Sequence, residues 1–140
     1  MSGTYVTSAM IVARLGQDRA VQLTTDSGTS VDTAMIDAAI TRVEGRINAA
    51  VRTRTSEVIT EAVYPATFAM LQGLVLDMTV YHLAARRPPV PDDWKEANTE
   101  ALEWLKLLAK GEVGLPDVGM GGAEFEWGSD DQNAATTREL

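Results

Sequence analysis

Residues 65–85 read PATFAMLQGLVLDMTVYHLAA and contain the longest apolar stretch of the 140-residue chain. Three polar side chains interrupt it: Gln72, Asp77 and His82. A helix that crosses a bilayer needs roughly 20 mostly apolar residues, so this stretch predicts a buried helix of a soluble protein instead. Pro65 suits the first turn of such a helix, and Pro88 follows its end because the residue before a proline avoids helical geometry. We expect this helix at the centre of the fold.

Helical periodicity recurs on both sides of the central segment, and no strand-type alternation precedes the C-terminal tail. Three further helices are predicted: one that starts after Thr7 or Ser8 and stops at Gly16, one over about 31–54, and one over about 91–110. Residues 17–23 predict no more than a helical turn, and residues 53–63 leave loop, short helix and edge strand open. The fold class is therefore all-α, a small bundle of about four helices with an extended C-terminal tail.

The predicted helix over residues 31–54 has an apolar stripe and a polar outer face. The outer face carries Asp37, Arg42, Glu44, Arg46, Asn48 and Arg52. Arg42 and Arg46 are one turn apart and share a face. The straightforward interpretation is a solvated surface, and the alternative is a surface that binds an acidic partner.

For two residues of the last helix and two of the central helix, the sequence predicts a specific contact or role. Leu102 and Trp104 widen the apolar sector of the last helix, so we expect one of them, with Trp104 as the candidate, to contact another chain. Asp77 needs a partner such as Tyr81 or an arginine from another helix, because a buried carboxylate must be paired. His82 follows Asp77 by five residues and lies on a different face, which favours a structural histidine.

Composition excludes several function classes. The chain has no cysteine and one histidine, which excludes disulfide scaffolds and thiolate zinc sites and argues against histidine-based catalysis. Its net charge is -8, so the molecule as a whole repels phosphate backbones and anionic lipids. We expect no enzyme activity, no catalytic, cofactor or metal site, and no membrane association.

Most of the negative charge lies at the C-terminal end. Residues 112–140 are rich in glycine and hold seven acids against one base, which predicts a helical domain over 1–111 and a tail over 112–140. Within the tail, residues 123–127 read AEFEW and alternate apolar and acidic side chains with the period of a strand. We expect Phe125 and Trp127 to dock on a partner, and the tail to become ordered on assembly.

The order of these features resembles a known family. The matching pieces are Tyr5-Val6-Thr7, Ala13-Arg14-Leu15-Gly16, Gln22-Leu23-Thr24, the helix that starts at Asp32, Leu74, Asp77, Tyr81-His82-Leu83, Ala101-Leu102-Glu103-Trp104-Leu105 and Ala109-Lys110-Gly111. Taken together over residues 5–115, they resemble the Mu-like phage head-completion family, a group of head-tail connector (adaptor) proteins.

The resemblance implies a structural protein of the virion, made in the host cytoplasm and located in the neck between capsid and tail. It implies a ring of about twelve copies that contacts the portal protein on one side and a tail-side connector or tail terminator on the other. DNA would pass through the channel of that ring without sequence-specific binding.

Two rival functions come from other classes. The first is a small helical regulator that binds nucleic acid through Arg42, Arg46, Arg52 and Arg54, although the overall acidity argues against it. The second is an enzyme that uses Asp77 and His82 with groups from elsewhere in the chain.

Overall fold

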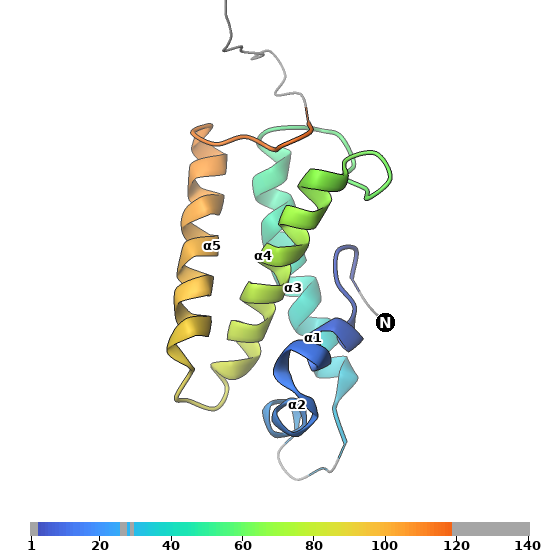
Figure 1. Cartoon of the computed structure of the whole chain (residues 1–140), viewed down its shortest axis with the longest axis vertical. Helices are drawn as coiled ribbons and strands as arrows, with labels where there is room; N and C mark the ends of the chain where they lie inside the picture. Colours follow the sequence, from blue (N-terminus) through green and yellow to red (C-terminus); the bar gives the residue numbers. More distant parts are fainter. Residues whose placement is uncertain (1–2, 26–27, 29, 119–140) are drawn as a thin grey trace, which may run out of the picture.

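The computed structural model describes residues 3–25, 28 and 30–118 and confirms an all-α fold (Figure 1). Its helices are α1 (Ser8–Leu15), α2 (Gln17–Thr24), α3 (Thr33–Arg52), α4 (Pro65–Ala84) and α5 (Asp92–Lys110). No strand occurs in the described ranges. Four of these helices match the predicted segments. The fifth, α2, is a full helix where the sequence predicted only a helical turn.

The helix ends follow local chemistry. The side chain of Thr7 accepts a hydrogen bond from the Met10 amide at the start of α1, and Asp32 does the same for α3. Such caps satisfy amides that lack partners within the helix. Gly16, with φ of 90°, separates α1 from α2, and Gly111, with φ of 81°, ends α5. Because side chains disfavour positive φ, glycine suits both stops.

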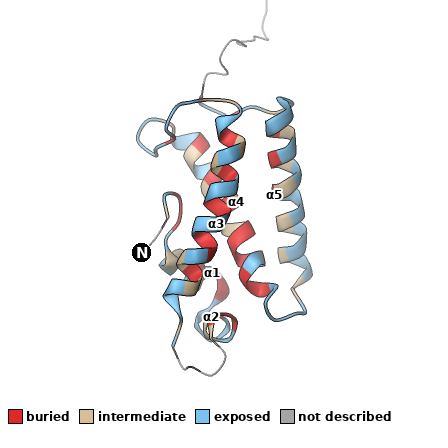
Figure 2. Ribbon diagram, turned by 180° about the vertical axis from the view of Figure 1, so that it is seen from behind, coloured by how far each residue is buried: buried red, intermediate tan, exposed pale blue. Residues whose placement is uncertain are grey.

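The three long helices α3, α4 and α5 form a bundle, and α1 with α2 covers one end of it (Figure 1). α3 and α4 form the centre of the fold, because each of them packs against all four other helices. Figure 2 shows the buried residues concentrated where α3 and α4 face the interior, whereas α5 is largely exposed. The largest fully buried side chains include Ile36, Ile40, Ile47, Leu71, Leu83 and Leu108. Within the described residues, no helix is long and apolar enough to cross a membrane.

Glu44 on α3 corrects the prediction of a solvated outer face. Its side chain is buried, with 6% of the residue exposed. Its carboxylate accepts hydrogen bonds from the backbone amides of Thr4 and Tyr5, both at 2.8 Å. The N-terminal segment therefore lies against α3 and removes Glu44 from solvent. Helical periodicity could not predict this, because the covering segment comes from outside the helix.

Tyr5 adds further links between the N-terminal segment and the bundle. Its hydroxyl donates to Asn48 on α3 at 2.9 Å, and its carbonyl accepts from Gln72 on α4 at 2.9 Å. Its ring packs against Phe68 with centroids 5.4 Å apart. Burial, and secondarily the charge of Glu44, raises the pKa of the Tyr5 hydroxyl. The hydroxyl therefore stays protonated and keeps donating to Asn48 at neutral pH.

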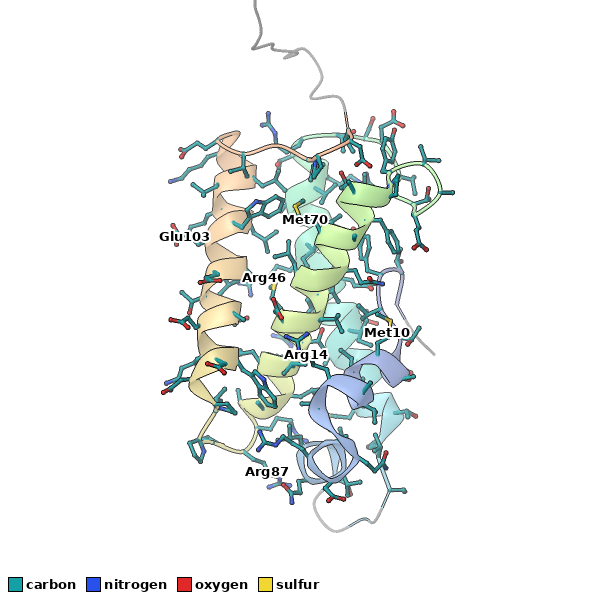
Figure 3. All side chains as sticks on the ribbon, in the orientation of Figure 1. Met10, Arg14, Arg46, Met70, Arg87 and Glu103 are labelled. Atoms are coloured by element: carbon teal, nitrogen blue, oxygen red, sulfur yellow. The ribbon has the colours of Figure 1, made fainter. Side chains whose placement is uncertain are left out.

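Asp77 on α4 is only partly buried, and of the two kinds of partner that the sequence left open, Tyr81 or an arginine, the structure shows the arginine. Arg14 on α1 lies 2.8 Å from its carboxylate, and the two side chains are 41% and 28% exposed. Exposed ion pairs typically contribute about 0–1 kcal/mol, so this pair orients α1 on α4 more than it stabilises the fold. Figure 3 shows Arg14 beside α4.

Residues 53–64, between α3 and α4, contain no helix or strand. Ile59 is buried and fixes the loop on the core, whereas Val58 and Val63 are 67% and 64% exposed. Arg52 also holds the loop, because its guanidinium donates to the carbonyl of Glu57 at 2.9 Å. Of the alternatives left open by the sequence, the loop is the one observed.

The packed structure continues beyond Gly111 to Val118. Leu115 and Val118 are buried. Between them, Asp117 accepts hydrogen bonds from the amides of Ala66 and Thr67, at 2.8 and 3.0 Å, and from the Thr67 hydroxyl. The residue that precedes α4, Tyr64, makes no side-chain cap. Asp117 therefore caps α4 from a distant part of the chain, where a negative charge also suits the helix dipole.

The Asp117 cap predicts a specific pH dependence. The hydrogen bond from the Thr67 side chain, followed by those from backbone amides, lowers the pKa of Asp117 below its ordinary value of 3.8. A lowered pKa in the folded state means that the stabilisation is present above pH 3.8 and is lost as the pH falls through the folded value. We expect Asp117→Asn to lower the Tm at pH 7, and the difference from wild type to shrink below about pH 4. Thermal unfolding followed by circular dichroism between pH 7 and 2.5 measures this; a difference that stays constant with pH would contradict the cap.

Candidate interaction surfaces

The structure places three of the five candidate partner-binding residues. Arg42 and Arg46 are on α3, and Trp104 is on α5. Phe125 and Trp127 lie outside the described residues, so their docking on a partner stays a prediction.

Arg42 and Arg46 line one groove between α3, α4 and α5, which confirms that they share a face. This cationic groove has a volume of about 540 Å³. Its lining comprises Arg42, Val43, Arg46, Met78, Tyr81, His82, Asn98 and Leu102. Figure 3 shows Arg46 at mid-height of the bundle, beside α5. Both arginines are exposed, as expected of a solvated face, but they border a concave surface that also includes polar and apolar side chains of α4 and α5.

The electrostatics of the groove are positive. Neither Arg42 nor Arg46 forms an ion pair with a carboxylate among the residues that the structure describes. Desolvation, and then repulsion from Arg42 and Arg86, lowers the pKa of His82. The imidazole is therefore mostly neutral at pH 7, and the arginines carry the charge of the groove.

A smaller hollow of about 140 Å³ extends the cationic groove along α3 and α4. It shares Arg42 and His82 with the groove and adds Arg86 at its far side. The guanidinium of Arg86 donates to the carbonyl of Leu23 at the end of α2, which holds this side chain in place. Arg42 thus lies between two connected hollows.

The charges of α5 are segregated around the helix. Lys95 precedes Asn98 by three residues, and Lys106 follows Leu102 by four. Both lysines therefore lie on the side of α5 that borders the cationic groove. The acids of the middle of the helix follow a different stripe, at Glu96, Glu100 and Glu103. Figure 3 shows Glu103 pointing away from the bundle.

Trp104 borders a second hollow, on the other edge of α5. This hollow measures about 200 Å³ and lies between α4 and α5. It is lined by Met70, Leu74, Asp77, Ala97, Glu100, Ala101 and Trp104. Trp104 is partly buried against the core, and so is Leu102 on the cationic groove. The expectation that one of them contacts another chain remains a prediction.

A third hollow, of about 370 Å³, lies where α2 meets the connection between α4 and α5. Its two arginines are engaged by neighbours: Arg19 lies over the ring of Trp94 at 5.0 Å, and Arg87 donates to the carbonyl of Gln22 at 2.8 Å. A cation over an aromatic face stabilises the contact between α2 and α5. These arginines therefore hold the bundle together.

Comparison with protein families identifies the family to which this chain belongs. A family model described as "Bacteriophage Mu, Gp36" matches residues 5–124. The chain belongs to this family of phage proteins. No curated protein and no solved structure matches the chain.

The Mu Gp36 match begins at Tyr5, where the N-terminal segment first becomes buried, and includes every helix of the bundle. It therefore confirms the Mu-phage part of the resemblance seen in the sequence. The match also extends nine residues past Leu115, the last residue of that resemblance, and reaches Glu124.

The two residues considered for catalysis are not brought together in the structure. Asp77 borders the hollow of Trp104 and is bound to Arg14, whereas His82 borders the cationic groove. No group of three or more histidine, cysteine or acidic residues that could hold a metal ion occurs in the described part of the chain.

Sequence reasoning did not assign Met78, Tyr81 or Asn98 to an interaction surface, and it named Leu102 without placing it beside the arginines. Each belongs to a different helix from the arginines, and only the packing of α3, α4 and α5 brings them together. The single available signal was the excess apolar surface assigned to Leu102.

Proposed function

We propose that this member of the Mu Gp36 family is a head-tail connector: a structural virion protein whose copies form a neck ring between portal and tail and let DNA pass. The observation that carries the proposal is the family match over residues 5–124 of an all-helical bundle. The ordered sequence features that resemble connector proteins lie within the matched range.

The outer helix α5 supports assembly of several copies. Only Ala101, Leu105 and Leu108 are buried on this helix of 19 residues. Leu102 and Trp104, on its two edges, are only partly covered by the chain itself. Partly covered large apolar side chains beside hollows are typical of surfaces that another protein completes.

Charge supports the proposed passage of DNA. The chain carries a net charge of -8. A ring of such subunits repels the phosphate backbone overall, so a duplex in its channel would slide and not be held. We propose that the ring contacts the portal protein on one side and a tail-side connector or tail terminator on the other. The same proposal includes a copy number of about twelve.

The proposal predicts ring formation on the portal. Purified protein mixed with portal protein is expected to form rings on the portal vertex in negative-stain images, with a ring mass by light scattering. Trp104→Gln should reduce ring formation at least tenfold if α5 is a contact between copies, because it removes a large apolar anchor.

The matched control is Glu103→Gln, the neighbouring residue that points away from the bundle (Figure 3). It should leave ring formation unchanged, and both variants should keep the helical circular-dichroism signal. Wild-type protein that remains monomeric and never decorates the portal would contradict the connector function. Normal rings from Trp104→Gln would remove Trp104 from the contact.

The second candidate is a nucleic-acid-binding regulator, and the observation in its favour is the groove that Arg42 and Arg46 share. Arg52 supports it less, because its guanidinium is bound to the carbonyl of Glu57. Binding to a short DNA duplex that weakens steeply with salt, and that Arg42→Glu abolishes, would favour this candidate over the connector.

A further inference from the structure

We propose that the cationic groove receives residues 123–127, the acidic and aromatic segment of the C-terminal tail, from a neighbouring copy of the chain. The inference rests on the proposed connector function, because it requires copies that lie side by side. It names a specific segment that binds in the groove, which neither the family match nor the fold of the bundle identifies.

The chemistry of the groove suits an acidic and aromatic peptide. The planar guanidinium of arginine can bind a carboxylate through two parallel hydrogen bonds, and Arg42 and Arg46 have no such partner among the described residues. Tyr81 and Leu102, which are partly exposed, provide apolar surface between the helices. The volume of about 540 Å³ falls in the range of pockets that bury a ligand of moderate size.

The segment has the complementary pattern. Glu124 and Glu126 alternate with Phe125 and Trp127. In an extended peptide, successive side chains point to opposite sides, so the two carboxylates share one side and the two rings share the other. A peptide laid along the groove can then direct its carboxylates to the arginines while its rings cover apolar surface.

The other two hollows fit this segment less well. The hollow of Trp104 is bordered by Asp77 and Glu100, whose charges would repel Glu124 and Glu126. In the hollow between α2 and the α4–α5 connection, Arg19 is already engaged by Trp94, and Arg87 by a backbone carbonyl. Charge complementarity therefore selects the cationic groove.

The anchor at Asp117 favours a neighbouring copy as the source of the segment. Asp117 is bound beside Thr67, whereas the groove residues of α4 lie at positions 78–82, about 17–22 Å further along the helix at 1.5 Å per residue. The six residues from Val118 to Glu124 span at most about 20 Å. To reach these α4 residues in the same copy, the segment would need an almost fully extended path along the bundle, so we assign it to the groove of a neighbouring copy.

Photo-crosslinking of the full chain tests the position of the segment. Phe125 is replaced by benzoylphenylalanine, and isotope-labelled and unlabelled copies are mixed, assembled on the portal and irradiated. Mass spectrometry is expected to find crosslinks between the two labels that join position 125 to peptides containing Tyr81 or Leu102. The same photo-crosslinker at Val58, exposed on the loop between α3 and α4, should give no groove crosslinks.

A charge swap tests the mechanism of recognition. The groove-reversed variant carries Arg42→Glu and Arg46→Glu, and the tail-reversed variant carries Glu124→Lys and Glu126→Lys. Each variant should lower the crosslink yield at least tenfold, because like charges then face each other. Mixing groove-reversed copies with tail-reversed copies should restore it. Lys110→Glu, at the exposed end of α5, should not change the yield.

Several outcomes would overturn the inference. Crosslinks confined to one copy would exclude a neighbour's tail, and crosslinks elsewhere or unchanged by charge reversal would exclude the groove. Loss of salt-sensitive DNA binding in the groove variants alone would make the groove a nucleic-acid surface. If rings still form on the portal in any of these cases, the connector function stands; if wild-type rings never form, the connector function itself fails.

Discussion

Leu71→Ala is expected to lower the free energy of unfolding by about 3–4 kcal/mol. Leu71 is 0% exposed on α4, one of the two helices that contact all the others. Replacing a buried leucine with alanine loses its transfer free energy and leaves a cavity, and measured costs range from roughly 2.7 to 5 kcal/mol. Urea unfolding followed by circular dichroism should show a lower midpoint with an unchanged slope.

The control for Leu71→Ala is Val63→Ala, in the loop before α4. Val63 is 64% exposed, so its truncation should change the free energy of unfolding by less than about 0.5 kcal/mol. Similar losses for the two variants would mean that α4 is not the centre of the core. The arrangement of the bundle around α4 would then be wrong.

The features that the sequence predicted correctly are those fixed by nearby residues. Thr7 caps the helix that it precedes, and Gly16 and Gly111 end helices with positive φ. Such signals act within one turn of the backbone, so one sequence is enough to read them. The apolar run of α4 likewise predicts a central helix, because a helix that is apolar on all sides must be covered on all sides.

The features that the sequence missed depend on residues distant along the chain. Asp117 caps α4 from 50 residues away, and the helix α2 has a polar composition that indicated only a turn. Packing of Ala20 and Leu23 against the core favours a helix there over its weak local propensity. Tertiary contact of this kind leaves no periodic signal in the segment itself.

The candidate surfaces show the same division. The spacing of Arg42 and Arg46 correctly predicts that they share a face, because four residues make about one turn. The groove in front of them could not be predicted, because Tyr81 and Leu102 reach it from two other helices. The sequence predicted a partner for Asp77 but left Tyr81 and an arginine open, and only the structure identifies it as Arg14.

Glu44→Ala is expected to destabilise the protein by about 3 kcal/mol, although the substitution removes a charged residue from a helix face that reads as polar. The carboxylate accepts two backbone hydrogen bonds at 2.8 Å in a largely buried position. Hydrogen bonds to charged groups contribute about 1.5–3 kcal/mol each, and truncation leaves the buried amide of Tyr5 without its acceptor. The Tm should fall by roughly 10 °C, measured by thermal unfolding.

Three variants separate this explanation from a general effect of mutating α3 or removing acid charge. Glu44→Gln keeps an acceptor oxygen and should lose clearly less than Glu44→Ala, whereas the exposed Glu103→Ala should change stability by less than about 0.5 kcal/mol. Gly3→Ala should also destabilise, because an added Cβ would lie 2.4 Å from the Glu44 carboxylate and 2.5 Å from Ile40. Wild-type stability for both Glu44→Ala and Gly3→Ala would show that the N-terminal segment does not lie on α3. The family match begins at Tyr5, so the placement of a segment that the family shares would then be wrong.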